Sequence, residues 1–234
     1  MPNGNGGGAP DSKNHLLDRL RRLSWLSQEQ MNQIAEASRV LEVKRGAAIY
    51  RENEIADSIY VLLSGMATLW MPEAEPKVLV SVFGPGDIIG ISALMANGAR
   101  RFRCDALSEC KVAALPAGAF RSIVLGDPTS FEKGMQATFG RWETILHRYA
   151  KFMSLSARGR LAMALLELAD RFGVSNDRGR LLPFMVSHAM LAAMVGASRQ
   201  HVTMQLVEFE REKFLMRESR RLVVIVEKMR LAIK

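Results

Sequence analysis

The stretch SHAMLAAMVGASRQHVTMQL, Ser187–Leu206, has the pattern of two short helices joined by a tight connection. Ser187 and Ser198 stand where a serine side chain can cap the first backbone N–H groups of each helix. Gly196 lies between them, where the chain must turn sharply. The positions that would face inward are apolar or small: Leu191, Ala192, Val195, Val202 and Leu206. This spacing predicts a helix-turn-helix.

The outward side of the second helix carries residues suited to reading DNA bases. Arg199 and Gln200 fall in its first turn, and Thr203 and Met204 follow. In the major groove arginine pairs with guanine O6 and N7, and glutamine pairs with adenine N6 and N7. Arg199 and Gln200 therefore favour a sequence-specific contact with double-stranded DNA, although Met204 cannot donate a hydrogen bond.

Basic charge is concentrated in the same part of the chain. Residues 1–130 hold 14 Lys and Arg against 14 Asp and Glu, whereas residues 131–234 hold 18 against 10, which accounts for the net charge of +8. Downstream, Arg220 and Arg221 precede the β-branched run LVVIV, a pattern typical of a short hairpin or wing. A basic half indicates an anionic partner. The predicted DNA-binding residues are Ser187, Ser198, Arg199, Gln200, Thr203, Met204 and Arg220.

The N-terminal half has a different pattern of apolar and turn residues. Helical spacing over residues 15–37 is followed, from Val40 to Leu115, by short β-rich runs between turns about ten residues apart, which indicates an antiparallel sandwich or barrel. No apolar run reaches the length of a membrane span and the start does not resemble a signal peptide, so a cytoplasmic location is expected. Cys104 and Cys110 are expected to be packing residues, and no metal site is predicted.

A long helix should begin after Asp127, a good N-cap, with Pro128 in its first turn. Large side chains recur along it at alternating steps of four and three. Such a seam needs a partner helix and favours a homodimer over packing within one domain. The predicted dimer residues are Phe131, Met135, Thr138, Trp142, Ile145, Tyr149 and Phe152.

The stretch GDIIGISALMANGARRF, Gly86–Phe102, has the pattern of an anion-binding site. Turn glycines with free backbone N–H groups, followed by two arginines, are the usual means of holding a phosphate. Ile91 and Phe102 stand among these polar groups, however, and raise the question of whether a nucleotide still binds.

In this order of elements the chain resembles the cyclic-AMP-receptor/FNR (CRP/FNR) family of bacterial transcription regulators. The resemblance covers roughly Leu23 to Val226, and rests on SGMATLW, GPGDIIG, GRLAMALLELA and VGASRQHVTMQL. It implies an α+β fold with a β-roll sensor domain, a dimerisation helix and a C-terminal winged helix-turn-helix that binds palindromic DNA. RNA polymerase is an expected partner of any member that activates transcription.

Departures from the family pattern argue against cyclic AMP. Where cyclic-AMP-binding members carry a ribose-binding glutamate this chain has Ile91, and Phe102 replaces a phosphate-binding serine beside the matching Arg101. Ile145 and Leu146 replace two polar residues that bind adenine. Unpaired buried hydrogen-bonding groups cost about 1–3 kcal/mol each, so cyclic AMP should not bind. The candidate ligand-binding residues are Arg100, Arg101, Ser92, Ile91, Phe102, Ile145 and Leu146.

The sequence thus predicts a homodimeric DNA-binding regulator that works without ligand or with another effector, such as cyclic di-GMP or an apolar molecule. The alternative is a nucleotide- or small-molecule-binding module that acts through protein contacts. No catalytic arrangement is legible, so an enzyme is not expected, and no cofactor is predicted. The predicted segments are a flexible tail (1–14), a β-roll sensor (15–126), a dimerisation helix (127–154) and a DNA-binding domain (155–234).

Overall fold

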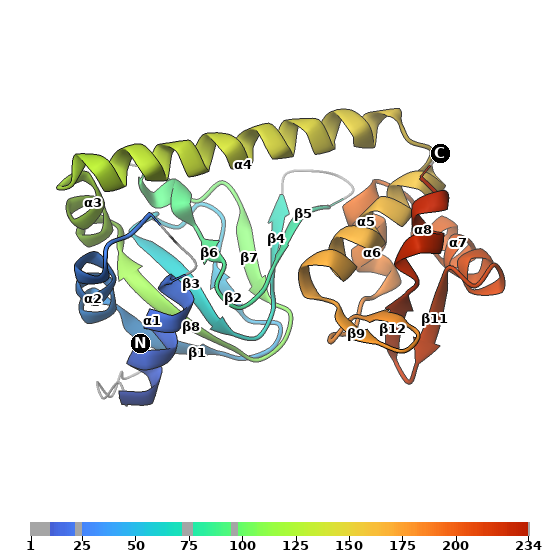
Figure 1. Ribbon diagram of the computed structural model, residues 1–234, viewed down its shortest axis with the longest axis horizontal. Helices are drawn as coiled ribbons and strands as arrows, with labels where there is room; N and C mark the ends of the chain where they lie inside the picture. Colours follow the sequence, from blue (N-terminus) through green and yellow to red (C-terminus); the bar gives the residue numbers. More distant parts are fainter. Residues whose placement is uncertain (1–9, 22–24, 72–76, 95–97, 234) are drawn as a thin grey trace. The chain divides into compact units, whose positions relative to one another are not determined.

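The computed structural model describes residues 10–21, 25–71, 77–94 and 98–233, so residues 1–9 of the predicted tail lie outside the described residues. The chain divides into two compact units (Figure 1). The N-terminal unit comprises residues up to Glu73 with Val80–Arg141, and the C-terminal unit comprises Ala74–Leu79 with Trp142–Lys234. The architecture is α+β, as predicted, whereas the predicted segment limits at 127 and 155 stay a prediction.

Two helices open the N-terminal unit where one helical stretch was expected. They are α1 (Pro10–Leu20) and α2 (Gln28–Ala37), and α1 includes residues 10–14, which the sequence placed in the flexible tail. Helix α2 begins at a capping box, because Ser27 Oγ accepts from the Gln30 N–H while Gln30 Oε1 accepts from the Ser27 N–H.

Two antiparallel sheets form the body of this unit. One has the order β1-β8-β3-β6 and the other β2-β7-β4-β5. The strands are β1 (Arg39–Val43), β2 (Ala48–Tyr50), β3 (Ser58–Ser64), β4 (Ala67–Met71), β5 (Val78–Phe83), β6 (Ile88–Ile89), β7 (Arg103–Ala106) and β8 (Cys110–Pro116).

Strand β3 is covered on both faces, which explains its unbroken apolar run. Ile59, Val61 and Leu63 pack in one core cluster with α1, α2 and α3 (Ala117–Leu125), and Leu62 packs on the opposite side with Ile89 and Cys104. Alternate side chains of a strand point to opposite faces, so both clusters share this strand. Helix α3 was not anticipated from the sequence.

Helix α4 (Pro128–Ser154) starts where the sequence predicted. The Asp127 carboxylate accepts hydrogen bonds from the Thr129 and Ser130 N–H groups, each at 3.2 Å. The hydrogen bond from the Ser130 hydroxyl is the main cause that holds the pKa of Asp127 below its ordinary value.

The C-terminal unit combines helices with one small sheet. Helix α5 (Ala157–Phe172) leads through the hairpin β9 (Val174–Asn176) and β10 (Gly179–Leu181) to α6 (His188–Val195) and α7 (Arg199–Arg211). The strands β11 (Leu215–Glu218) and β12 (Arg221–Val224) complete a sheet of order β11-β12-β10-β9. Helix α8 (Val226–Leu231), which the sequence did not predict, packs on α5 and buries Met229.

Both cysteines are buried free thiols, and burial raises the pKa of Cys104 to about 12. Within the described part of the chain, no helix is both long and apolar enough to cross a membrane. The described residues also contain no cluster of three or more His, Cys, Asp or Glu that could hold a metal ion.

Candidate nucleic-acid interface

Two serine caps and one glycine set the geometry of the helix-turn-helix. Ser187 Oγ accepts from the Met190 N–H at 3.0 Å and begins α6. Gly196 ends that helix in the left-handed conformation, with φ 60 and ψ 45. Ser198 Oγ then accepts from the His201 N–H at 3.1 Å and begins α7. A Cβ at position 196 would meet nothing within 4 Å, so the backbone conformation, and not lack of space, favours glycine there.

The inward side of both helices is buried. Helix α6 packs on α5 and α7, and α7 packs on β11. Each such apolar side chain contributes about 1.5–3 kcal/mol when it leaves water. The second helix is therefore held firmly by one face, which leaves its other face open to a partner. The side chains concerned, each 1% exposed or less, are Leu191, Val195, Val202, Leu206 and Phe209.

The outward side of α7 presents Arg199, Gln200 and Met204 to solvent, as predicted from their spacing. Thr203 is different, because its hydroxyl is engaged inside the motif. Thr203 Oγ1 donates to the Arg199 carbonyl at 2.9 Å and lies 2.7 Å from His188 Nδ1. Its methyl group therefore remains the part best suited to a base contact.

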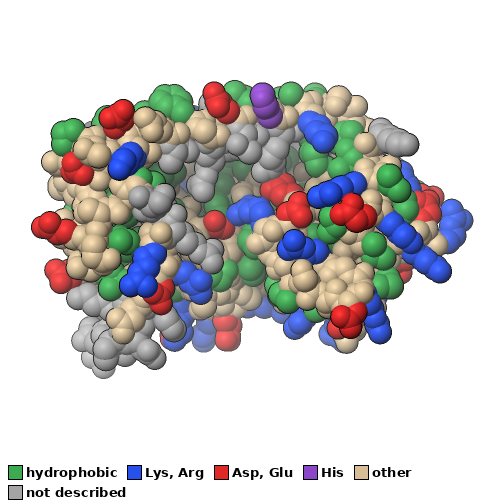
Figure 2. Space-filling model, in the orientation of Figure 1, with side chains coloured by type: hydrophobic (Ala, Val, Ile, Leu, Met, Phe, Trp, Pro, Cys, Tyr) green, Lys and Arg blue, Asp and Glu red, His purple; other side chains and the backbone are tan. Residues whose placement is uncertain are grey.

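The hairpin of β11 and β12 forms the predicted wing. Its turn passes through Ser219, a non-glycine residue with φ 58, and exposes Arg220 beside it. Arg217, on β11, donates from Nε to Glu210 Oε1 of α7 at 2.6 Å. Figure 2 shows Lys and Arg side chains, with acidic groups among them, over the C-terminal unit.

Two residues near this face were missed by the sequence analysis: His188, the first residue of α6, and Arg217 of the wing. His188 directly follows the Ser187 cap, which was an available signal, because the first helix of a helix-turn-helix crosses the DNA backbone. The position of Arg217 depends on the packing of β11 against α7, which no local pattern reveals.

Arg158 of α5 ties the C-terminal half of α7 in place. Its guanidinium donates to Glu208 at 3.3 Å and to Gln205 Oε1 at 3.4 Å, and also reaches Glu212. It lies over the Phe209 ring, with Cζ 4.6 Å from the ring centroid. Gln205, a polar residue on the half-buried side of α7, is thus held in a charged network.

In the N-terminal unit Arg100 is buried, whereas Arg101, which the family resemblance matches to the phosphate-binding arginine, is exposed. Arg100 is 2% exposed and donates from Nη1 to the Gly90 carbonyl and from Nη2 to the Ser58 carbonyl. Its Cζ lies 4.3 Å from the Tyr50 ring centroid. Gly90 has a φ of 77, which favours glycine, and a Cβ there would also come within 2.6 Å of Arg100 Nη1. The Arg100 side chain therefore has a structural role, because it links two backbone segments inside the N-terminal unit.

The other predicted ligand-binding residues are spread over different environments. Ile91, Ser92 and Arg101 are exposed, and Phe102 is half-buried. The nearby Arg103 pairs with Asp105 at 2.8 Å. Leu146 is exposed on α4, whereas the side chain of Ile145 lies outside the described residues. Within the N-terminal unit, therefore, no group of polar side chains is arranged around Ile91 among the residues that the structure describes.

Comparison with known protein families agrees with this geometry. Residues 40–127 match the family model described as a cyclic nucleotide-binding domain, and residues 159–232 match the model described as a Crp-like helix-turn-helix domain. The chain belongs to the CRP/FNR family of transcription regulators. Its helix-turn-helix is the DNA-binding element of that family.

Among curated proteins, the chain is 25% identical over 185 residues to the CRP-like cAMP-activated global transcriptional regulator of Mycobacterium tuberculosis. The matched region covers 79% of this chain and 83% of that protein. Among solved structures, FixK2 from Bradyrhizobium japonicum has a TM-score of 0.73 at 17% identity, with 84% and 98% of the two chains covered. The c-di-GMP responsive regulator CLP of Xanthomonas campestris has a TM-score of 0.70 at 19% identity, with 85% and 99% covered. These two structures share the CRP/FNR fold.

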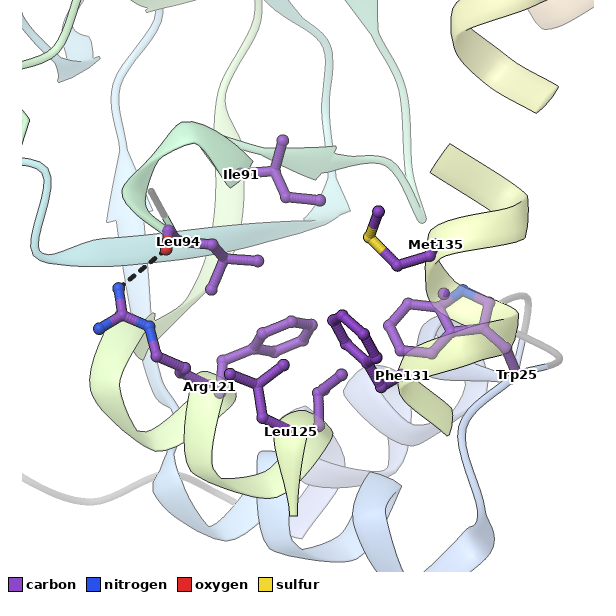
Figure 3. Close-up of a pocket in the computed structure, with 10 residues that line it drawn as sticks. Trp25, Ile91, Leu94, Arg121, Leu125, Phe131 and Met135 are labelled. Carbon is purple, nitrogen blue, oxygen red and sulfur yellow. Dashed lines mark hydrogen bonds between the residues drawn. The ribbon is translucent and has the colours of Figure 1, made fainter. Parts of the chain in front are cut away.

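This CRP/FNR regulator also has an apolar pocket of about 310 Å³ within its N-terminal unit (Figure 3). Aromatic and aliphatic side chains from η1 (Ile91–Leu94), α3, α4 and the segment before α2 converge on it. Arg121 stands at its edge and donates to the Leu94 carbonyl at 2.9 Å. Two residues predicted for the dimer seam contribute to its wall. The lining residues are Trp25, Ile91, Leu94, Phe120, Arg121, Val124, Leu125, Phe131, Gly134 and Met135.

Helix α4 of this family member carries a row of exposed large apolar side chains. Phe152, predicted to belong to the row, is half-buried, and the Arg160 guanidinium lies 5.4 Å from its ring centroid. Its neighbour Met153 is exposed instead. The side chains of Thr138, Trp142 and Ile145 lie outside the described residues. The exposed row, called the α4 row below, consists of Phe131, Met135, Phe139, Leu146, Tyr149 and Met153.

Proposed function

We propose that this CRP/FNR regulator is a homodimer that binds palindromic DNA in the cytoplasm, with α7 in the major groove of each half-site. The exposed Arg199 and Gln200 on a firmly anchored helix carry this proposal. Two half-sites about 34 Å apart would suit a twofold-symmetric dimer. Where such a regulator activates transcription, a contact with RNA polymerase belongs to the same proposal.

The test begins with a duplex selected from a random pool by the purified protein. Arg199→Ala should weaken binding to that duplex by about 1–3 kcal/mol, because a base-reading guanidinium is lost. Arg51→Ala is the matched control, since Arg51 is an exposed arginine of the N-terminal unit whose partner is Glu54. Equal affinities for the wild type and Arg199→Ala would contradict the assignment. Affinity should also fall steeply as salt is raised, unlike that of a module acting through protein contacts.

The second part of the proposal is that cyclic AMP is not the effector. Arg100 already uses Nη1 and Nη2 on two backbone carbonyls, and apolar or aromatic residues stand at Ile91, Phe102, Ile145 and Leu146. A phosphate could recruit Arg100 only by breaking buried hydrogen bonds, each of which leaves an unsatisfied carbonyl. The regulator is therefore proposed to act without ligand or with a different effector.

Cyclic di-GMP stays among the other effectors, since the Xanthomonas neighbour is described as responsive to it. Its phosphates would have to use the exposed Arg101, because Arg103 is paired with Asp105. Calorimetric titration with each nucleotide, followed by DNA affinity with and without it, separates the cases. Micromolar binding of cyclic AMP that changes DNA affinity would overturn this part of the proposal and leave the DNA assignment intact.

A further inference from the structure

His188 connects the two helices of the helix-turn-helix through a hydrogen-bond chain. Its Nδ1 lies 2.7 Å from Thr203 Oγ1, and Thr203 Oγ1 donates to the Arg199 carbonyl. Because the single hydroxyl proton is used on the carbonyl, the hydroxyl oxygen must accept from the imidazole. Nδ1 therefore carries a proton, and Nε2 is the ring nitrogen that changes its protonation state.

The surroundings of His188 are cationic. The charged groups that act on it electrostatically are Arg199 and Glu210 of α7 and Arg217 of β11. Partial burial lowers the pKa of His188, Arg217 and Arg199 lower it further, and Glu210 raises it. Glu210 is itself paired with Arg217, at 2.6 Å between Oε1 and Nε. Without DNA, then, the neutral form of His188 is favoured, and in that form Nε2 has a lone pair and no proton.

A DNA phosphate beside His188 would counter the cationic surroundings and would favour a proton on Nε2. Phosphate oxygens only accept hydrogen bonds, so the neutral Nε2 offers them nothing, whereas a protonated Nε2 donates while Nδ1 keeps its bond to Thr203. The negative charge of the backbone also favours the imidazolium and offsets the two arginines. His188 is the first residue of α6, and the first helix of a helix-turn-helix crosses the DNA backbone when the second helix lies in the major groove.

We propose that His188 is a phosphate-contacting residue of the DNA interface and takes up one proton from solvent when DNA binds. This inference rests on the DNA-binding function proposed above. It makes the affinity for DNA depend on pH. The pKa of His188 is higher in the complex than in the free protein, so affinity increases as pH falls through the interval between the two values. One proton per subunit changes affinity by at most about tenfold per pH unit per half-site.

Three proteins test this at constant ionic strength, from about pH 5.5 to about pH 8.5. The wild type should bind the selected duplex more tightly at the acid end and take up protons, as measured by calorimetry in buffers of different ionisation enthalpy. His188→Asn keeps a donor for Thr203 but cannot be protonated, so it should lose His188's share of the proton uptake and bind like the wild type at high pH. His188→Arg carries a permanent charge, so at about pH 8.5 it should bind several-fold more tightly than His188→Asn.

His147→Asn is the matched control, because His147 is exposed and lies on α4 and not in the helix-turn-helix, so its loss should leave the pH slope unchanged. Thermal unfolding of each variant shows whether the fold is retained. If His188→Asn weakened binding equally at every pH and kept the wild-type proton uptake, His188 would have only a positioning role and the inference would be overturned. Absence of specific DNA binding by the wild type at all pH values would instead overturn the proposed function, and this inference with it.

Discussion

The guanidinium of Arg158 lies over the Phe209 ring, with 4.6 Å between Cζ and the ring centroid, and thereby joins α5 to α7. The same guanidinium donates to Gln205 and Glu208. One residue of the helix that follows α4 thus restrains the helix expected to read DNA. Its planar, delocalised charge suits both the ring and the carboxylates.

Replacing Arg158 with methionine should lower the free energy of unfolding of the C-terminal unit by about 1–2 kcal/mol, because a cation–π contact and partly exposed ion pairs are lost. The aliphatic stem is retained, so little packing changes. Calorimetry on the full chain measures the effect. Arg230→Met is the control, since the exposed side chain of Arg230 pairs with the exposed Glu227 on the same helix, and should change stability by less than about 0.5 kcal/mol. Similar losses in both variants would contradict a special role for Arg158.

Substitution of Arg100 should destabilise the protein far more than substitution of the adjacent Arg101. Arg100→Met leaves the Ser58 and Gly90 carbonyls without their buried donors and should destabilise the N-terminal unit by about 2–4 kcal/mol. Arg101→Met removes an exposed side chain and should have an effect below about 0.5 kcal/mol. Thermal unfolding followed by the near-ultraviolet signal of the aromatic residues compares them. A larger loss of stability for Arg101→Met than for Arg100→Met would show that the structural role belongs to Arg101.

Buried thiols should make the N-terminal unit sensitive to alkali. Burial raises the pKa of Cys104 from 9.0 to about 12, with Asp105 and Cys110 adding to the shift. The folded state therefore favours the protonated thiol, and the stability that this supplies is complete below about pH 9 and is lost as pH rises toward about pH 12. The unfolding midpoint should fall across this interval. In Cys104→Ala it should fall less steeply, and equal slopes would contradict a contribution from this thiol.

The local features of the helix-turn-helix were predictable because they depend on residues close in sequence. Serine caps at Ser187 and Ser198 and a turn at Gly196 are formed by bonds within one helical turn. The bounds of α5 follow from the same kind of signal, with Ser156 before the helix and Gly173 after it. Such features need no knowledge of the rest of the chain.

The choice between Arg100 and Arg101 could not be predicted, because alternate residues of an extended segment point to opposite sides. The side is set by pairing with a distant segment: Asn53 N–H donates to the Arg100 carbonyl and Arg100 N–H donates to the Glu54 carbonyl, each at 2.8 Å. The partial burial of Phe152 on α4 also depends on packing between elements, because the Arg160 guanidinium that lies near its ring belongs to the next helix, α5. The contact between His188 and Thr203 likewise exists only once α6 and α7 have packed.

The α4 row is expected to be the dimer interface, and a charge placed within it should separate the subunits. Leu146→Glu puts a carboxylate where apolar side chains would be buried, at a cost of several kcal/mol when no partner charge is available. Sedimentation equilibrium should show monomers of this variant at concentrations at which the wild type is dimeric. Glu143→Gln, an exposed position three residues earlier on the same helix, should remain dimeric. Because a palindromic site is bound by two subunits, Leu146→Glu should also lose most of its affinity for the selected duplex. Its affinity for a single half-site should equal the weak affinity of the wild type. If Leu146→Glu remained dimeric, the dimer interface would lie elsewhere.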